Sequence, residues 1–182
     1  MSEPIEFDPV DAISAGAFGR PGARTFVIQA RKGGARLSVL VEKEQVALLA
    51  AEAGEFLDRI DEEDPDAGVP PSVDDPGPVE EDEPLFRARL IGIGYDPERR
   101  LVLIELRENA PEEDEDTDEL PGFGEDTQPD DIPGRIARLY ATRGQVRAMV
   151  AHGAASVSAG RPHCPLCDFP MDPDGHICPR WN

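Results

Sequence analysis

The hydrophobic and polar positions of this chain form short apolar stretches that are separated by turn residues. Several of these stretches are rich in β-branched and aromatic residues, which favour strands, and a short turn between two of them predicts a β-hairpin. The first 22 residues show no such pattern and are interpreted as an irregular lead-in. Five strands are predicted: Arg24–Ala30 and Ala35–Glu42 around the turn RKGG, Leu85–Tyr95 and Arg100–Arg107 around the turn DPER, and Gly134–Ala141.

Two other stretches carry apolar residues at the spacing of an α-helix. They are Lys43–Ile60 and Thr142–Gly160. A stripe with this period allows one face of each helix to pack on a sheet. Thr142 and Gln145 also have the spacing of a capping box, which marks the start of the second helix.

A weak internal sequence repeat links the two predicted helices. Gln45 and Val46 recur as Gln145 and Val146, one hundred positions later, and a predicted strand leads directly into a helix in both places. The similarity of the two stretches predicts a pseudo-repeat of sheet-plus-helix units. Common ancestry and common physical requirements explain it equally well.

Together these elements predict an α+β fold. We expect a mainly antiparallel five-stranded sheet with two helices packed on it, two disordered acidic loops and a C-terminal tail that resembles a zinc ribbon. The predicted domains are residues 1–160, with acidic loops at about 61–84 and 109–133, and a zinc-binding tail at residues 161–182.

The net charge of −20 is concentrated in the two predicted loops. Asp61–Glu83 and Asn109–Pro133 each contain 11 acidic residues and no Lys or Arg. Such segments have little to bury and many like charges, so they are predicted to be solvated. The rest of the chain has 16 acidic and 18 basic residues. The folded body is therefore nearly neutral, and its charge does not exclude a nucleic-acid partner.

All three cysteines and two of the three histidines lie in the final segment, HCPLCDFPMDPDGHICPRWN. Cys164 and Cys167 form a C-x-x-C motif, whose tight turn can present two thiolates to one ion. His176 and Cys178 are two positions apart, so an extended backbone places them on one face. Three thiolates and one imidazole are typical of a closed, structural Zn²⁺ site, and these four residues are the predicted ligands.

Three alternatives to this ligand set stay open. His163 could replace His176, although it adjoins Cys164 and is expected to point away from the same ion. The cysteines could also be unpaired thiols or form a redox-active C-x-x-C, but the prolines around them prevent the helix that such a redox motif usually opens.

The expected location of the protein is the cytoplasm, with no membrane association. An odd number of clustered cysteines argues against a secreted disulfide framework. No stretch resembles a signal peptide or reaches the roughly 20 apolar residues that a membrane span needs.

Catalysis has little support in the sequence. No G-x-S-x-G, H-E-x-x-H or P-loop motif is present, and GAFGRPG leads into a predicted strand instead of a helix. The first hypothesis is a non-catalytic zinc-binding adaptor for another protein. The alternatives are a nucleic-acid-associated factor and an enzyme with an unrecognised site. The second hypothesis depends on the arginines of the C-terminal third, which are Arg135, Arg138, Arg143, Arg147, Arg161 and Arg180.

Three stretches of the chain resemble a known family. GRPGARTFVIQAR, SVLVEKEQVALLA and CPLCDFPMDPDGHICPRWN are similar to sequences of the DUF3090 family, an uncharacterised actinobacterial family of about this length. The resemblance implies a cytosolic protein without assigned catalysis. It supports His176 and Cys178 as functional positions and supplies no reaction.

Overall fold

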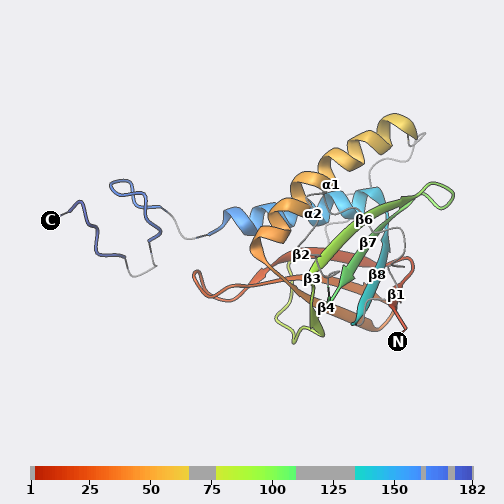
Figure 1. Cartoon of the computed structure of the whole chain (residues 1–182), viewed down its shortest axis with the longest axis horizontal. Helices are drawn as coiled ribbons and strands as arrows, with labels where there is room; N and C mark the ends of the chain where they lie inside the picture. Colours follow the sequence, from red (N-terminus) through yellow and green to blue (C-terminus); the bar gives the residue numbers. More distant parts are fainter. Residues whose placement is uncertain (1–2, 66–76, 110–133, 161–162, 172–174, 182) are drawn as a thin grey trace, which may run out of the picture.

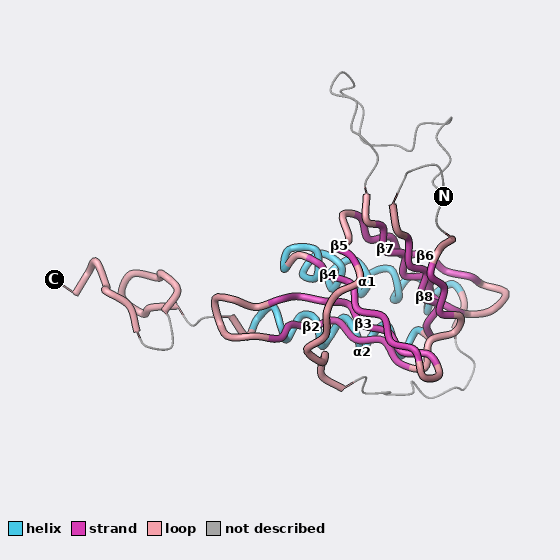
Figure 2. Tube along the Cα trace, turned by 90° about the horizontal axis from the view of Figure 1, so that it is seen from below, coloured by secondary structure: helices cyan, strands magenta, loops and turns pink. Residues whose placement is uncertain are grey.

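The computed structural model describes residues 3–65, 77–109, 134–160, 163–171 and 175–181. In this part of the chain, eight strands and two helices are present (Figures 1 and 2). In chain order they are β1 (Ile5–Phe7), β2 (Ala12–Phe18), β3 (Thr25–Lys32), β4 (Ala35–Val41), α1 (Lys43–Glu63), β5 (Phe86–Arg87), β6 (Leu90–Asp96), β7 (Leu101–Arg107), β8 (Ile136–Ala141) and α2 (Arg143–Ser158).

The described strands form two four-stranded sheets, with the orders β1-β8-β7-β6 and β2-β3-β4-β5. Each sheet is antiparallel except at one edge, where β1 pairs in parallel with β8 and β5 pairs in parallel with β4. The α+β class, the two helices and both predicted hairpins are confirmed. The prediction of one five-stranded sheet was wrong.

The error has two physical causes. The supposed lead-in contains β1 and β2, and β2 has the sequence AISAGAF, whose small residues give a weak strand signal. Small residues are needed there because a Cβ at Gly16 would lie only 3.2 Å from the Ser156 hydroxyl oxygen and from Val79. The predicted strand Leu85–Tyr95 is also two strands, since Ala88 bonds to β4 and Arg89 bonds to β7.

The two sheets are built from two units of the same order. β1-β2-β3-β4-α1 and β5-β6-β7-β8-α2 each contain one short strand, three longer antiparallel strands and a helix. Their registers agree: Phe26 pairs with Val41 in the first unit, and Val102 pairs with Ala141 in the second. The short first strand of each unit pairs with the last strand of the other unit. The predicted pseudo-repeat therefore extends over both sheets.

Gln45 and Gln145, which match in the weak sequence repeat, occupy equivalent positions in the two units. Each accepts a hydrogen bond from the N-cap backbone through its amide oxygen, at 2.8 Å from Glu42 and 2.9 Å from Thr142. Each then donates from its amide nitrogen to the backbone that follows the first strand of the opposite unit: Gln45 to Arg89 at 3.3 Å and Gln145 to Asp11 at 3.1 Å. One glutamine thus caps its own helix and joins the two units.

The two acidic stretches lie at different boundaries of this architecture. One connects α1 to β5, and the other connects β7 to β8, where the first unit has only the turn Gly33–Gly34. Residues 66–76 and 110–133, and with them most of the predicted disorder, lie outside the described residues. Of the predicted first loop, residues 77–84 contain no helix or strand, whereas its first three residues belong to a helix. α1 continues to Glu63, and the backbone of Glu80 exchanges hydrogen bonds with the Gln29 side chain at 2.7 and 2.8 Å.

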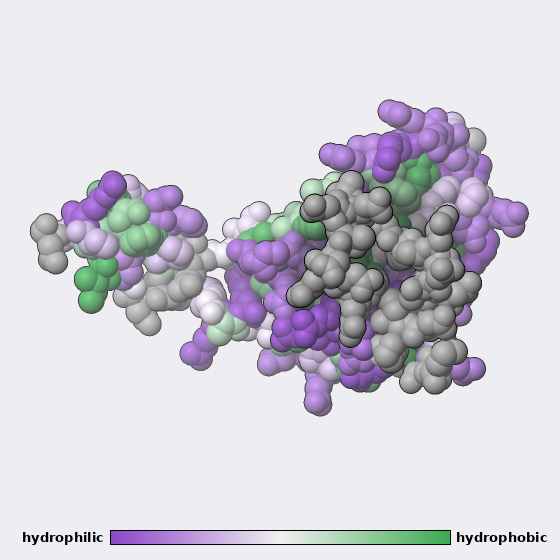
Figure 3. Space-filling model, viewed as in Figure 1, coloured by the Kyte–Doolittle hydropathy of each residue, from purple (hydrophilic) through white to green (hydrophobic). Residues whose placement is uncertain are grey.

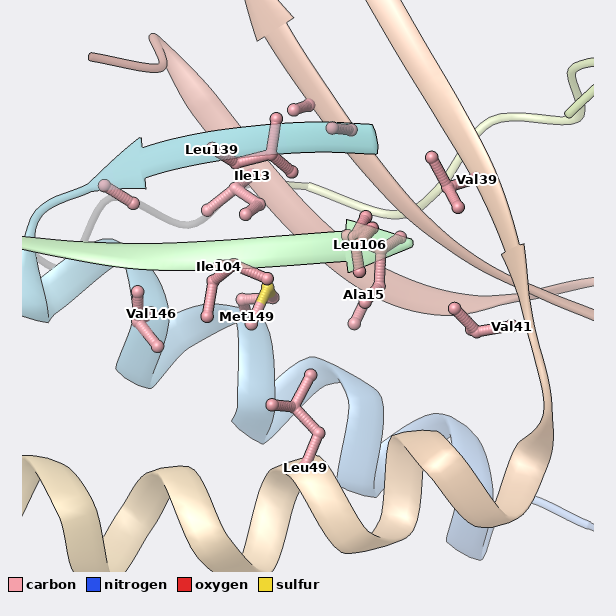
Figure 4. Close-up of a cluster of buried hydrophobic side chains, with 14 of the residues drawn as sticks. Ile13, Ala15, Val39, Val41, Leu49, Ile104, Leu106, Leu139, Val146 and Met149 are labelled. Carbon is pink, nitrogen blue, oxygen red and sulfur yellow. The ribbon is translucent and has the colours of Figure 1, made fainter. Parts of the chain in front are cut away.

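The hydrophobic core lies between the sheets and the helices (Figure 4). Val39 and Val41 come from one sheet, and Ile104, Leu106 and Leu139 come from the other. Leu49 of α1 and the α2 residues Val146 and Met149 complete the cluster. The helices lie side by side and antiparallel, since the start of α2 contacts the end of α1 through Arg143 and Asp61, while Gly153 approaches Val46.

Candidate metal centre in the C-terminal tail

The tail, residues 163–171 and 175–181, lies apart from the two-sheet body (Figure 1). No hydrogen bond or ion pair joins these tail residues to the described part of the body. So short a segment cannot bury a hydrophobic core of its own, and its order requires another source of stability.

The first arm of the tail is a tight turn around the C-x-x-C motif. The Cys164 amide donates to the Phe169 carbonyl at 2.8 Å, and the Asp168 amide donates back to the Cys164 carbonyl at 2.9 Å. Asp168 has a φ of 62°, in the left-handed region that Asp tolerates better than most residues. This turn places the sulfurs of Cys164 and Cys167 on the same side.

The second arm brings His176 and Cys178 to the first. Gly175, with a φ of 92°, changes the chain direction immediately before His176. The Arg180 guanidinium then donates to the Leu166 carbonyl at 2.9 Å, which joins the two arms.

The four predicted ligands converge. Their ligand atoms all lie within 4.8 Å of one another. The Cys164 and Cys178 sulfurs are 3.9 Å apart, and the Cys167 sulfur is 3.3 Å from His176 Nε2. Tetrahedral Zn²⁺, with Zn–S of about 2.3 Å and Zn–N of about 2.0–2.1 Å, requires separations of about 3.8 and about 3.6 Å. The chemistry and the spacing of these side chains therefore fit a metal ion.

The alternative histidine is placed elsewhere. His163 Nδ1 lies 2.9 Å from the backbone oxygen of Asp168 and 3.4 Å from its carboxylate. Its side chain is 61% exposed, and it is not among the clustered residues. The geometry therefore favours His176 over His163 as the nitrogen ligand.

The thiols of the cluster influence one another's protonation. Backbone hydrogen bonds from Leu166 and Cys167 lower the pKa of Cys164. At Cys167 a backbone hydrogen bond from Phe169 acts in the same direction, but desolvation and the contacts with Cys164 and Cys178 raise its pKa overall. Ionisation of one thiol thus makes ionisation of its neighbours less favourable. A divalent cation that binds the thiolates removes this penalty.

A family model described as "Protein of unknown function (DUF3090)" matches residues 5–178. The chain belongs to the DUF3090 family. The matched span covers both structural units and all four residues of the cluster, and it ends at Cys178. Comparisons with curated proteins and with solved structures find no match. Neither described helix of this DUF3090 protein combines the length and apolarity needed to cross a lipid bilayer.

Four of the six arginines that suggested a nucleic-acid surface are paired with acids in the DUF3090 structure. Arg180 donates instead to the Leu166 carbonyl, and Arg161 lies outside the described residues. Arg135 bonds to Glu108 at 2.7 Å, and Arg138 bonds to Glu105 at 2.8 Å. Arg147 bonds to Asp58 at 2.9 Å and to Asp61 at 2.6 Å. These pairs neutralise the basic side chains locally. Asp61, which the sequence assigned to a solvated loop, belongs to the last turns of α1.

Arg143 is the buried member of this group, with only 6% of its side chain exposed. It binds Asp61 at 3.0 Å, Asp64 at 2.8 Å and the Tyr95 hydroxyl. The Tyr95 hydroxyl donates in turn to Asp64 at 2.8 Å. Arg143 therefore links α2 to the end of α1 and to the β6–β7 hairpin, which is a structural role.

The protonation of this network predicts how stability responds to acid. The Tyr95 hydrogen bond, and then Arg100 and Arg143, lower the pKa of Asp64. Although burial opposes it, hydrogen bonds from Arg147 and Arg143 lower the pKa of Asp61. Carboxylates with lowered pKa values stabilise the fold above their ordinary pKa of about 4, and this contribution is lost as the pH falls through the lowered values. Urea unfolding from pH 5 downwards should therefore show a steeper loss of stability in the natural protein than in Asp64→Asn.

Asp58→Asn is the matched control, since Asp58 does not touch Arg143. It should follow the natural protein's acid profile. Equal slopes for all three proteins would contradict the network's role.

Proposed function

We propose that this DUF3090 protein is a non-catalytic zinc-binding protein whose C-terminal tail docks another protein. The observation that supports it best is the combination of a four-ligand cluster with uncovered apolar side chains in one short segment. Ile177 is 92% exposed and Trp181 is 79% exposed, although both are large and apolar. Leu166 and Phe169 are also exposed, and apolar side chains are visible on the tail surface in Figure 3.

The ligand set supports a structural ion. Four protein ligands complete a tetrahedron and leave no position for a water molecule, whereas a catalytic zinc retains one. The binding energy of Zn²⁺ would order the tail, because the ligands converge only when the two arms fold together. A rigid tail can then present its apolar side chains at a low entropic cost.

Charge supports a protein partner over a nucleic acid. Three thiolates around Zn²⁺ leave one negative charge. Across residues 161–182 the two arginines and three aspartates add a further −1, so the total is −2. Such a segment is repelled by phosphates. Exposed aromatic and aliphatic side chains with few cations are instead typical of protein interfaces. These four apolar residues, more than the arginines, are the site features that the sequence interpretation missed. The sequence feature that could have predicted them is the number of large apolar residues in the tail, which is more than so short a segment can bury.

The test is an affinity purification of the tagged full-length protein with nuclease treatment, followed by mass spectrometry. In the double variant Ile177→Ser/Trp181→Ser, proteins retained by the natural chain should decrease at least tenfold, since truncating central apolar anchors costs about 2 kcal/mol or more each. Zinc content should stay at one ion per chain, which shows that the tail is still folded.

Leu48→Ser is the matched control, because Leu48 is a 59% exposed apolar residue on α1. It should retain the same proteins as the natural chain. Retention that disappears with nuclease would favour the nucleic-acid alternative. An exchangeable water on the metal, with hydrolytic activity, would favour the enzyme.

A further inference from the structure

A cavity of about 590 Å³ lies at the end of the body from which the tail departs. It is formed where α1 begins, α2 ends and the β2–β3 hairpin and β5 meet them. Its volume is within the range of about 300–1,000 Å³ found for small-molecule sites. The apolar part of its wall consists of Phe26, Leu40, Val41, Pro84 and Val157.

Three cationic side chains line the same cavity: Arg24, Lys43 and Arg87. Arg87 is paired with Glu42, and Arg24 donates one hydrogen bond to the Ser156 carbonyl at 3.1 Å. Within the described residues, no carboxylate lies within ion-pair distance of Arg24 or Lys43, although Glu44 also lines the cavity. Two cations therefore face this space without a counter-ion from the described part of the chain.

The second unit of the fold shows what two such cations hold. By strand register Arg24 corresponds to Arg100, and by position at the helix start Lys43 corresponds to Arg143. Arg100 and Arg143 converge on one carboxylate: Arg100 lies 3.0 Å from Asp64 Oδ1, and Arg143 lies 2.8 Å from Asp64 Oδ2. The protein thus contains an internal example of a carboxylate held between these two positions.

The first unit lacks this carboxylate because its neighbouring helix is shorter. α1 continues to Glu63 and delivers Asp64, but α2 ends at Ser158, five positions before the equivalent of Glu63. In addition, Ala17 stands at the register position of Tyr95, so no phenol ring fills the space. The cavity therefore occupies the position that Asp64 and the Tyr95 ring fill beside the second unit.

We propose that this cavity binds a small organic carboxylate. The carboxylate lies between Arg24 and Lys43, as that of Asp64 lies between Arg100 and Arg143, and the apolar part of the ligand packs on Phe26 and Val157. This inference does not depend on the metal cluster or on a docking partner.

The test is calorimetric titration of the zinc-loaded full-length protein with octanoate and with phenylacetate. We expect dissociation constants on the order of 0.1–1 mM, as the sizes of these ligands allow. Phenylacetamide, which is uncharged, should bind at least tenfold more weakly than phenylacetate. Acetate, which lacks the apolar body, should also bind at least tenfold more weakly.

Two sets of variants locate the site. Lys43→Ala and Arg24→Ala should each weaken octanoate binding at least tenfold, and Arg59→Ala, an arginine of α1 outside the cavity, should leave it unchanged. Gly160→Asp supplies a carboxylate in cis, because a Cβ at Gly160 lies 4.0 Å from the Lys43 ammonium nitrogen and meets ordinary space. It should abolish binding, while the isosteric Gly160→Asn should not.

The proposal would be overturned if neither carboxylate bound at millimolar concentration. It would equally fail if binding persisted in Lys43→Ala and Gly160→Asp, or if the amide bound as well as the acid. Thermal denaturation of each variant separates loss of the fold from loss of the site.

Discussion

Replacing Cys178 with serine should reduce the zinc content of the purified protein from one ion per chain to less than a tenth. Cys178 lies 3.9 Å from Cys164 and supplies one of the four clustered ligand atoms. Structural Zn²⁺ binding is worth about 10–16 kcal/mol, nearly all of it folding energy in a segment that has no core. Elemental analysis measures the ion, and amide NMR spectra should show the tail signals collapse to random-coil positions while those of the body persist.

His163→Ala is the matched control, since His163 contacts Asp168 and lies outside the cluster. It should keep its zinc, whereas His176→Ala should lose it. Thiol titration adds a second readout: the natural protein should show no reactive thiol without denaturant, and Cys178→Ser should show two. A metal-free tail that stays ordered would contradict the zinc site.

Replacing Arg143 with alanine should lower the free energy of unfolding by about 3 kcal/mol, measured by urea denaturation at pH 7. The expected loss is large because the Arg143 side chain is only 6% exposed and binds two carboxylates and a tyrosine hydroxyl. Removing it leaves Asp61 paired only with Arg147 and Asp64 paired only with Arg100. The cation that joins α1, α2 and the β6–β7 hairpin is then lost.

Arg147→Ala removes a guanidinium one turn further along α2 and serves as the comparison. Its side chain is 39% exposed and pairs with acids at the surface, so its loss should cost less than about 1 kcal/mol. Equal effects of the two substitutions would show that Arg143 is not the central residue of the junction. If the natural protein bound nucleic acid and Arg147→Ala did not, the result would support the hypothesis that these arginines form a nucleic-acid-binding surface.

The elements that could be predicted from the sequence are those whose signals are local. The amphipathic stripe of α1 and the capping pair Thr142 and Gln145 depend on neighbours within one or two turns, and the structure shows both. The convergence of Cys164 with Cys167 also follows from a four-residue motif. The same holds for the turn at Asp96, whose carboxylate accepts hydrogen bonds from the backbone amides of Glu98 and Arg99.

The features that escaped prediction depend on contacts between distant parts of the chain. β2 is stabilised as a strand by β3 and α2, not by its own small residues. The pairing of Arg143 with Asp64 joins positions 79 residues apart, so Arg143 looked like part of a basic surface. The cavity near Lys43 is lined by residues of both helices and of β3, β4 and β5, so no single stretch of the sequence predicts it.

The crossing of β1 and β5 between the sheets has a consequence for any attempt to divide the molecule. A fragment that ends after α1 has a vacant sheet edge beside β4 and carries a first strand without its partner β8. Unsatisfied edges of this kind invite pairing with a second chain. Two copies of such a fragment could close on each other about a two-fold axis, each donating its leading segment to its neighbour. The full-length protein resembles that symmetric dimer joined into a single polypeptide.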